Sequence, residues 1–434
     1  MKKNLFTVFL MISFLGFGQY TYVPDDNFEQ ALIDLGYDDV LDNQVLTSNI
    51  ENEFVLNISD LGISDLTGID GFENLSELYC YNNNLLELDL SNNPNINRLF
   101  VQNNNLENIN ISNCPILVFF NCSNNNLTNL DLTQNFYLRD LTFHNNLISE
   151  MDFSQNPFLQ TIDCINNQLV SLDLSNNSEL YRLNCKDNNI SSLNISENEN
   201  LRFLFCENND LTELNLENNF SLEQLFCDHN YLGDINISQN VQLIELFCSN
   251  NKISSIDLSN NINLRGLNID FNMLTNLDLS NNINLKFLNC NSNNLSELNI
   301  KNGNNINILE NEDGYGGFTS INNLNLLCIQ VDDASWSAAN WTNVDEWSTF
   351  NEDCNYMAVS DEDLNEISIY PNPTKNILNF SENLKEISIY DLSGKLFKKG
   401  KGDQINVSNL SKGTYLLKGI TSSGKKINQK FIKN

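Results

Sequence analysis

Eight cysteines recur at intervals of 21 or 42 residues, and thiols at so regular a spacing raise the possibilities of metal binding and disulfide formation. The same slot holds Val101, Phe143 and Ile269 elsewhere, so it accepts a buried hydrophobe. Side chains in such a column point the same way, which strains a disulfide torsion and does not converge on a tetrahedral metal. We therefore expect inert, buried thiols and no metal site. The column comprises Cys80, Cys122, Cys164, Cys185, Cys206, Cys227, Cys248 and Cys290.

The histidines and carboxylates offer no catalytic group either. His144 and His229 are four periods apart, which places them about 20 Å from each other at the usual strand spacing. The sequence contains no nucleophile, zinc or phosphate-loop motif. Acids are plentiful, but a regular repeat without insertions has no cleft that would desolvate a pair of them. We expect no enzyme activity and no cofactor.

One acidic column could bind calcium. Asp131, Asp152 and Asp173 succeed one another at the same slot, and Ca²⁺ would relieve their mutual repulsion. The alternative is a solvated acidic face that is screened by salt, and we favour it. The whole column is Asp89, Asn110, Asp131, Asp152, Asp173, Asn194, Asn215, Asn236, Asp257, Asp278 and Asn299.

These columns exist because residues 75–305 repeat every 21 residues, eleven times, without insertion or deletion. A strict period of this length is typical of a solenoid. One asparagine column marks the register, and its amides are expected to bond the turn backbone of their own and the next coil. It consists of Asn83, Asn104, Asn125, Asn146, Asn167, Asn188, Asn209, Asn230, Asn251, Asn272 and Asn293. A second column fills the matching slot of the other half-repeat in nine repeats, with Cys114 and Gly303 as exceptions.

Each period divides into halves of 10 and 11 residues, and both contain an apolar–polar–apolar triplet. The sequence LYRLNCKDNNISSLNISENEN at residues 180–200 shows the pattern nearly intact. Alternation of this kind predicts a short strand in each half. The pattern resembles the leucine-rich repeats, in particular the bacterial 21-residue nested class called IRREKO. We therefore predict a mainly β fold: a leucine-rich repeat solenoid with short parallel strands on both sides of each coil and capped ends.

Aromatic residues recur just before the cysteine column, at positions whose side chains should face solvent. Phe205, Phe226 and Phe247 are consecutive, with Phe203 beside them; Tyr79 and Phe100 form a second cluster with Tyr81 and Phe119. Exposed contiguous aromatics usually mark an interaction surface. The alternative is that the rings only stabilise the sheet by cross-strand packing. We predict a partner-binding site at Phe203, Phe205, Phe226, Phe247, Tyr79 and Phe100.

Charge separates the chain into two parts. The net charge of −33 argues against nucleic acid and anionic membranes as partners. Residues 364–434, however, hold 12 of the 23 basic residues and only 5 of the 56 acids. This break predicts a domain boundary, preceded by a short linker at residues 358–363.

The ends of the repeat array are expected to be capped. Residues 1–18 read as a secretory signal, and no later run is long enough to span a membrane. Residues 19–52 predict a helical cap, in which Phe28, Ala31, Leu32 and Leu35 form an apolar stripe that ends at Gly36. Residues 53–305 would form the solenoid and 306–357 the second cap. Cys328 and Cys354 lie outside the thiol column of an exported protein, so we expect a disulfide between them, the alternative being two buried free thiols.

Residues 364–434 contain short alternating strands separated by turns, which favours a small β-sandwich. The segment closely resembles the type A C-terminal sorting domain of the type IX secretion system of Bacteroidota. The matching residues include Pro371, Asn372, Pro373, Gly413, Tyr415 and Lys430. The resemblance implies recognition by the type IX secretion machinery, removal of this domain, and release or attachment at the outer-membrane surface of a Gram-negative bacterium.

Together these features predict a secreted or cell-surface leucine-rich repeat protein that binds a protein or polysaccharide and has no chemistry of its own. We favour a protein partner on the exposed sheet face. The alternatives are a carbohydrate-binding or adhesion module, whose stacked aromatics would suit sugar rings, and a structural component of the surface.

Overall fold

The computed structural model describes residues 19–309, 317–354, 367–391, 394–422, 424 and 426–434. The expected signal at residues 1–18 and the linker at 358–363 lie outside this part of the chain. The chain divides into two compact units, residues 1–251 and 252–434. Each unit is described by itself.

The first unit begins with a helix clamped by a small antiparallel pair. Strand β1 (Tyr20–Tyr22) pairs with β2 (Gln44–Leu46), and between them runs α1 (Asp26–Asp34). Asp25 is the N-cap and accepts hydrogen bonds from the backbone N–H groups of Asn27 and Phe28. The apolar stripe is shorter than its spacing predicts, because Leu35 is the C-cap residue and is 47% exposed. Short 3₁₀ turns follow at η1 (Thr47–Asn49) and η2 (Ile69–Gly71).

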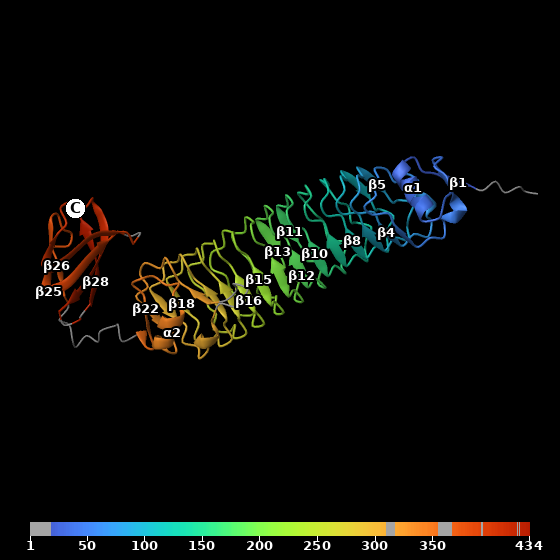
Figure 1. Cartoon of the computed structure of the whole chain (residues 1–434). Coiled ribbons are helices and arrows are strands. Elements are labelled where there is room, and N and C mark those ends of the chain that lie inside the picture. Colours follow the sequence, from blue (N-terminus) through green and yellow to red (C-terminus); the bar gives the residue numbers. More distant parts are fainter. Residues whose placement is uncertain (1–18, 310–316, 355–366, 392–393, 423, 425) are drawn as a thin grey trace, which may run out of the picture. The chain divides into compact units, whose positions relative to one another are not determined.

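Ten parallel strands form the long sheet of the first unit, in chain order (Figure 1). Each strand has three residues, and every residue from β4 on pairs with the one 21 positions further, as Leu183 does with Leu204. The strands are β3 (Val55–Asn57), β4 (Glu77–Tyr79), β6 (Arg98–Phe100), β8 (Phe119–Asn121), β9 (Asp140–Thr142), β10 (Thr161–Asp163), β12 (Arg182–Asn184), β14 (Phe203–Phe205), β15 (Gln224–Phe226) and β16 (Glu245–Phe247).

The opposite side of the coils is less regular than the alternation predicts. Strands form there in only some coils, as the pairs β5 (Glu87–Asp89) with β7 (Asn108–Asn110) and β11 (Ser171–Asp173) with β13 (Ser192–Asn194). The apolar residues of the other coils still point inward; Leu132 and Phe153, for example, are buried. The apolar residues of the triplet are therefore buried on both sides of the coils, even where no continuous sheet forms on the second side.

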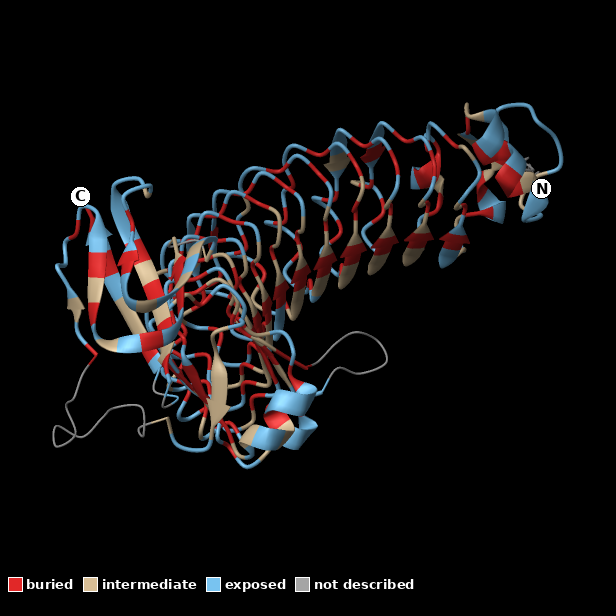
Figure 2. Cartoon of the chain, turned by 60° about the vertical axis from the view of Figure 1, so that its left-hand side comes forward, coloured by how far each residue is buried: buried red, intermediate tan, exposed pale blue. Residues whose placement is uncertain are grey.

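The core of the first unit is a column of leucines, cysteines and asparagines. The middle residue of each long-sheet strand is buried, and in every strand but β3 and β12 both of its neighbours are half-buried, which appears as red between tan in Figure 2. The side-chain amides of the first asparagine column bond the turn backbone of their own coil, as predicted. Their other hydrogen bonds are to the preceding coil and not to the next one. The Asn104 side-chain amide donates to the carbonyls of Cys80 and Val101, both at 3.0 Å, and its Oδ1 accepts from the N–H of Leu85.

The second asparagine column serves the other turn. Asn156 is fully buried, and its side-chain amide donates to the carbonyls of Leu132 and Asn135 in the preceding coil, both at 3.0 Å. The coils are thus joined on both sides by amides that reach one period back. These bonds satisfy carbonyl groups that a tight apolar coil would otherwise leave without partners.

A left-handed residue precedes the first column in every coil of the first unit from residue 82 onward. Such backbone favours asparagine, aspartate and histidine among residues with side chains. The residues are Asn82, Asn103, Asn124, Asn145, Asn166, Asp187, Asn208, His229 and Asn250, with φ between 52° and 58°.

The second unit begins with further coils. The parallel path β17 (Gly266–Asn268), β19 (Phe287–Asn289) and β21 (Gly317–Thr319) lies on one side. Strands β18 (Asn276–Asp278), β20 (Glu297–Asn299), β22 (Cys328–Gln330) and β23 (Thr349–Asn351) lie on the other. The 21-residue spacing ends here, but its amides persist: Asn323 bonds Cys290 and Leu295 as a first-column residue would, and Asn302, beside Gly303, donates to Asn282.

A short helix and a disulfide complete this part of the second unit. A 3₁₀ turn, η3 (Asn305–Asn307), precedes β21 in the chain, and helix α2 (Ala334–Asn340) comes after β22. The Asp333 carboxylate caps the N-terminus of α2. Trp341 is buried and its indole N–H donates to the Ile308 carbonyl at 2.8 Å. Cys328 and Cys354 form a disulfide, which ties β22 to the residues just after β23.

The C-terminal residues form a five-stranded antiparallel sheet. Strand β25 (Ile377–Tyr390) pairs with β24 (Ile369–Tyr370), with β26 (Leu396–Asn406) and with β27 (Gly413–Thr421), and β27 pairs with β28 (Lys426–Lys433). Irregular register along β25 lets one strand serve several partners. The sheet encloses its own apolar core, which includes Leu378, Ile387, Leu417 and Phe431.

Candidate partner-binding surface

The long sheet of the first unit brings the predicted aromatic residues into one row. Parallel pairing places Phe205 beside Phe226 and Phe226 beside Phe247. All three are half-buried, because their side chains leave the face of the sheet opposite to the buried leucines Leu204, Leu225 and Leu246. The 21-residue period, acting through this register, makes three residues that are distant in sequence neighbours in space.

The rings of this row contact one another. The centroids of Phe226 and Phe247 are 4.5 Å apart with nearly parallel planes, and those of Phe205 and Phe226 are 5.1 Å apart and tilted by 66°. The guanidinium carbon of Arg182 lies 5.1 Å from the Phe205 centroid. The row is therefore a continuous series of contacts between one arginine and three phenylalanines, which we call the phenylalanine ladder. Cation–π contact and ring packing both stabilise it.

Polar residues flank the phenylalanine ladder. Phe203 lies under the Arg202 guanidinium at 5.3 Å, and Arg202 donates to the Glu223 carboxylate at 2.7 and 3.0 Å. In the next coils Gln224 donates to Glu245 at 2.7 Å. An apolar row beside hydrogen-bonded charged groups has the composition of a protein interface core with its rim.

The N-terminal aromatic cluster has a similar construction. The rings of Tyr79 and Phe100 stack at 5.0 Å, and Arg98 lies 4.3 Å from the centroid of Phe119. The Tyr79 hydroxyl donates to the Glu77 carboxylate at 2.7 Å, and this hydrogen bond, with burial, raises the pKa of Tyr79. The structure therefore pairs Tyr79 with Phe100 in one cluster and the four phenylalanines in another, several coils along the sheet.

A third aromatic cluster was not predicted from the sequence. Phe136, Tyr137 and Phe158 lie in the turns that precede the strands of the long sheet, and they are 46%, 52% and 38% exposed. The signal was present, because these residues follow the second asparagine column by one or two positions. Strand alternation predicts exposure only within strands, so it says nothing about the side chains of the turns.

The cysteine column is chemically quiet. Its eight thiols and that of Cys114 are buried and take no part in a disulfide. Burial raises the pKa of every one of these thiols for which a shift is resolved, to about 12 at Cys114 and further at Cys80. The Cys114 thiol lies 3.7 Å from the carbonyls of Leu90 and Asn93, where its column otherwise has asparagine. Protonated, buried thiols are poor nucleophiles and poor metal ligands.

The acidic column has a structural use. Hydrogen bonds from the backbone and hydroxyl groups of Thr133, Ser154 and Ser175 lower the pKa values of Asp131, Asp152 and Asp173. Where an asparagine follows in the next coil, as Asn110 follows Asp89, its amide donates to the aspartate. Within the described ranges, no three histidine, cysteine or acidic residues are grouped as a metal site would require.

The sorting residues predicted from the sequence come together in the C-terminal sheet. The Asn372 side chain donates to the Lys430 carbonyl at 3.0 Å and accepts from the Ile432 N–H at 2.8 Å. It thereby fixes the turn of Pro371 and Pro373 to strand β28, some sixty residues away. Tyr415 is buried against Phe431 and donates to the Ser411 carbonyl, near Gly413 at the start of β27.

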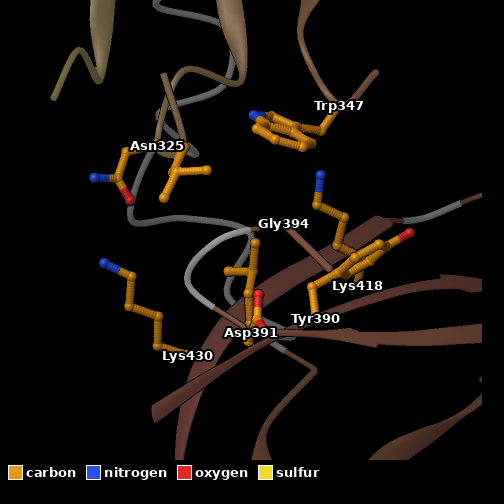
Figure 3. A pocket seen from close by; sticks show the side chains of 9 residues that line it. Asn325, Trp347, Tyr390, Asp391, Gly394, Lys418 and Lys430 are labelled. Carbon is orange, nitrogen blue, oxygen red and sulfur yellow. The ribbon is translucent and has the colours of Figure 1, made fainter. Parts of the chain in front are cut away.

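Lys430 is one of the residues that line a small pocket in the second unit (Figure 3). The Lys418 ammonium points at the Trp347 ring, 4.6 Å from its centroid, and burial lowers the pKa of Lys418 to about 8 against the opposing effect of Asp345 and Glu346. Asp391 is the one carboxylate among the lining residues, and it accepts from the Lys395 N–H.

Residues 368–434 match the family described as the secretion system C-terminal sorting domain. This domain indicates export by type IX secretion, so the protein is secreted or displayed on the cell surface. No helix among the described residues has the length and apolar character to cross a membrane. No curated protein sequence matches the chain.

Solved structures similar to this chain are leucine-rich repeat proteins. The functional domain of InlJ from Listeria monocytogenes, which includes a cysteine ladder, has a TM-score of 0.59 at 22% identity, covering 96% of this chain and 98% of that one. An internalin, InlF, of the same species has a TM-score of 0.58 at 20% identity, over 75% and 95%. A leucine-rich repeat protein of Leptospira interrogans has 0.56 at 17%, over 70% and 85%. The likeness establishes the leucine-rich repeat fold predicted from the period.

Proposed function

We propose that this exported leucine-rich repeat protein binds another protein through the long sheet of its first unit, without catalysing a reaction. The phenylalanine ladder is the centre of the contact, and the Tyr79–Phe100 pair is a second contact nearer the N-terminus. The observation that carries the proposal is the row of three contacting, half-exposed rings on a sheet face. Aromatic residues and arginine are the side chains that contribute most to protein interfaces.

The orientation of the rings favours a protein over a polysaccharide. A sugar ring stacks on an open aromatic face, but Phe226 lies between Phe205 and Phe247 and contacts both. The outer side of Phe205 is covered by Arg182. These contacts reduce the open ring face that a sugar could stack on, while the ring edges suit aliphatic and aromatic side chains of a protein partner.

The double variant Phe205→Ala with Phe226→Ala tests the proposal. The full chain and the variant are immobilised and exposed to the extracellular proteins of the native environment, and each captured protein is purified and its Kd measured. We expect the variant to lose about tenfold or more in affinity. Its unfolding midpoint should fall by only a few degrees, because half-exposed rings contribute about 1 kcal/mol per pair.

The matched control is Val170→Ala, since Val170 is a 53% exposed apolar residue that lies outside the strands of the long sheet. It should leave both affinity and unfolding unchanged. A large loss of stability in the double variant with unaltered affinity would mean that the ladder only braces the sheet. Binding to a glycan array that the double variant abolishes would favour the carbohydrate alternative.

A further inference from the structure

The fold does not require large apolar side chains at the positions of the third aromatic cluster. Phe136 and Tyr137 lie between the buried residues Asn135 and Leu138, whose backbone groups close the turn with a 3.1 Å hydrogen bond. Residues in these two slots cannot reach the core. The second slot is polar in the coils that follow, with Glu179, Asn200 and Ser221, whereas Ile116, Tyr137 and Phe158 occupy it in three consecutive coils. Large apolar side chains in the turns of these coils therefore call for an explanation outside the core.

The exposed side chains form one patch across neighbouring coils. Phe136 contacts Tyr137 and Phe158 edge-on, with centroids 5.3 Å apart in both pairs, and the rings of Tyr137 and Phe158 are parallel at 6.0 Å. Ile116, in the corresponding turn of the preceding coil, is 41% exposed. We call these four residues the turn cluster. Contiguous exposed apolar surface of this kind is typical of a docking site.

One exposed arginine, Arg139, lies close to the turn cluster in the sequence. The whole chain has five arginines, and each lies in a strand of the long path or in the residue just before it: Arg98, Arg139, Arg182, Arg202 and Arg265. In the first unit Arg98 and Arg202 form ion pairs with Glu77 and Glu223. Arg139 and Arg182 have no carboxylate within ion-pair distance among the described residues.

Arg139 is the arginine of the turn cluster. It follows Tyr137 and Leu138 directly and is exposed. The carboxylate next to it, Asp140, accepts a hydrogen bond from the Thr161 hydroxyl instead. An exposed guanidinium two positions after an exposed aromatic residue, in a protein of net charge −33, is complementary to a carboxylate that arrives together with an apolar side chain.

We propose that the turn cluster docks a segment of another protein in which an acidic residue lies next to a large apolar one. The carboxylate pairs with Arg139, and the apolar side chain rests on Tyr137 and Phe158. This site is separate from the phenylalanine ladder and does not depend on it. Phe136 contacts the other two rings edge-on, and the exposed side chains of Tyr137 and Phe158 lie parallel to each other, an apolar surface that suits a peptide side chain.

A random dodecapeptide library selected on the full chain tests the proposal. We expect the enriched peptides to share aspartate or glutamate beside an aromatic or aliphatic residue. Their affinity, measured by fluorescence anisotropy, should fall about tenfold or more in Arg139→Gln and in Tyr137→Ser with Phe158→Ser. Replacing the acid of the peptide by its amide should weaken binding to the same extent. The unfolding midpoints of these variants should stay unchanged, because the altered side chains are exposed.

Two matched controls use equivalent slots elsewhere. Arg265→Gln alters the same slot as Arg139, and Phe220→Ser alters the same slot as Phe136; both should leave the affinity unchanged. Enrichment no greater than that on the Tyr137→Ser, Phe158→Ser variant overturns the proposal, and so does equal binding of the amide peptide. Peptides that lose affinity only for Phe205→Ala with Phe226→Ala would overturn it while supporting the ladder as the binding site.

Discussion

At the scale of single residues, the coils are joined by buried amides. Asn188 is typical: its Nδ2 donates to the carbonyls of Cys164, Cys185 and Lys186 at 3.0–3.1 Å, and its Oδ1 accepts from the N–H of Leu169. One side chain thus satisfies backbone groups of two coils. A shorter side chain would leave those groups buried and without partners.

We predict that Asn188→Ala lowers the free energy of unfolding by about 3 kcal/mol, since each buried group left unsatisfied costs about 1–3 kcal/mol. The neighbouring Asn189 is exposed and makes none of these side-chain bonds, so Asn189→Ala should change it by less than about 0.5 kcal/mol. Urea unfolding followed by circular dichroism measures both. Equal losses would show that the amide column is not a special source of stability.

The cysteine slot gives a second prediction at this scale. Its occupants Val101, Phe143 and Ile269 indicate that it selects for apolar packing, and burial raises the pKa of Cys206 well above its ordinary value. Cys206→Val should therefore cost less than about 1.5 kcal/mol. Cys206→Ser, which has nearly the same size, should cost about 1–3 kcal/mol because it buries a hydroxyl. Thermal unfolding of the two variants compares them; a better tolerated serine would contradict the apolar interpretation.

At the scale of elements, helix α1 is held to the first coil by one carboxylate. Asp25 caps the helix through Oδ1, and its Oδ2 accepts from the N–H and hydroxyl of Ser64 and from the N–H of Asp65. Burial raises the pKa of Asp25, but these hydrogen bonds outweigh it and hold the pKa below 3.8. The same side chain therefore orders the helix and docks it.

This arrangement predicts a pH-dependent effect of Asp25→Asn. The pKa is lower in the folded than in the unfolded chain, so the ionised carboxylate stabilises the fold above about pH 4 and loses this effect as the pH falls through the folded-state pKa. At pH 7 the variant should be less stable by about 1 kcal/mol. At pH 3 the difference should shrink, as measured by thermal unfolding at both pH values. A constant difference would mean that charge at Asp25 is unimportant.

The elements also show how far sequence reasoning reached. The period is sufficient to predict that Phe205, Phe226 and Phe247 adjoin, because parallel pairing at a fixed register leaves no other arrangement. It could not predict on which side of the coils some strands are missing, because the apolar residues on that side are buried whether or not strands pair there. The period also could not identify Asn323 as a member of the first asparagine column. The spacing has changed at this point of the chain, so only the hydrogen bonds of its side chain show that it has the same role.

The candidate site was predictable only where it lies on strands. Alternation places Phe205 on the solvent side, but it says nothing about ring orientation, which decides between a sugar and a protein as ligand. The turn cluster was invisible to that reasoning because Phe136 and Tyr137 stand outside any strand. Contacts between coils, not the pattern within one, assemble both surfaces.

At the scale of the whole molecule, charge opposes the fold. Outside the basic residues 364–434, the chain carries 51 acids and 11 basic residues. Like charges on successive coils repel, and salt screens this repulsion, with a Debye length that falls from about 30 Å at 0.01 M to about 8 Å at 0.15 M. The aspartates of the acidic column nevertheless bind their own turns.

We therefore predict that the unfolding temperature rises by a few degrees between about 0.01 and 0.15 M NaCl because repulsion is screened. At equal ionic strength, Ca²⁺ should stabilise no more than Mg²⁺, since the carboxylates are already hydrogen-bonded and are not grouped around a common point. Differential scanning calorimetry compares the three salts. A rise of several degrees specific to Ca²⁺, abolished by Asp152→Asn, would support the calcium alternative.

The uniform register of the long sheet also bears on how such a chain evolves. Because each coil from β4 to β16 meets its neighbours through the same slots, a gene segment encoding 21 residues can be duplicated or lost without disturbing the joints on either side. Recombination between coils would then shift the phenylalanine tract along the array or lengthen it by single steps. Ligand preference in related proteins could thus diversify by shuffling whole cassettes, with point mutation confined to the few positions that face outward.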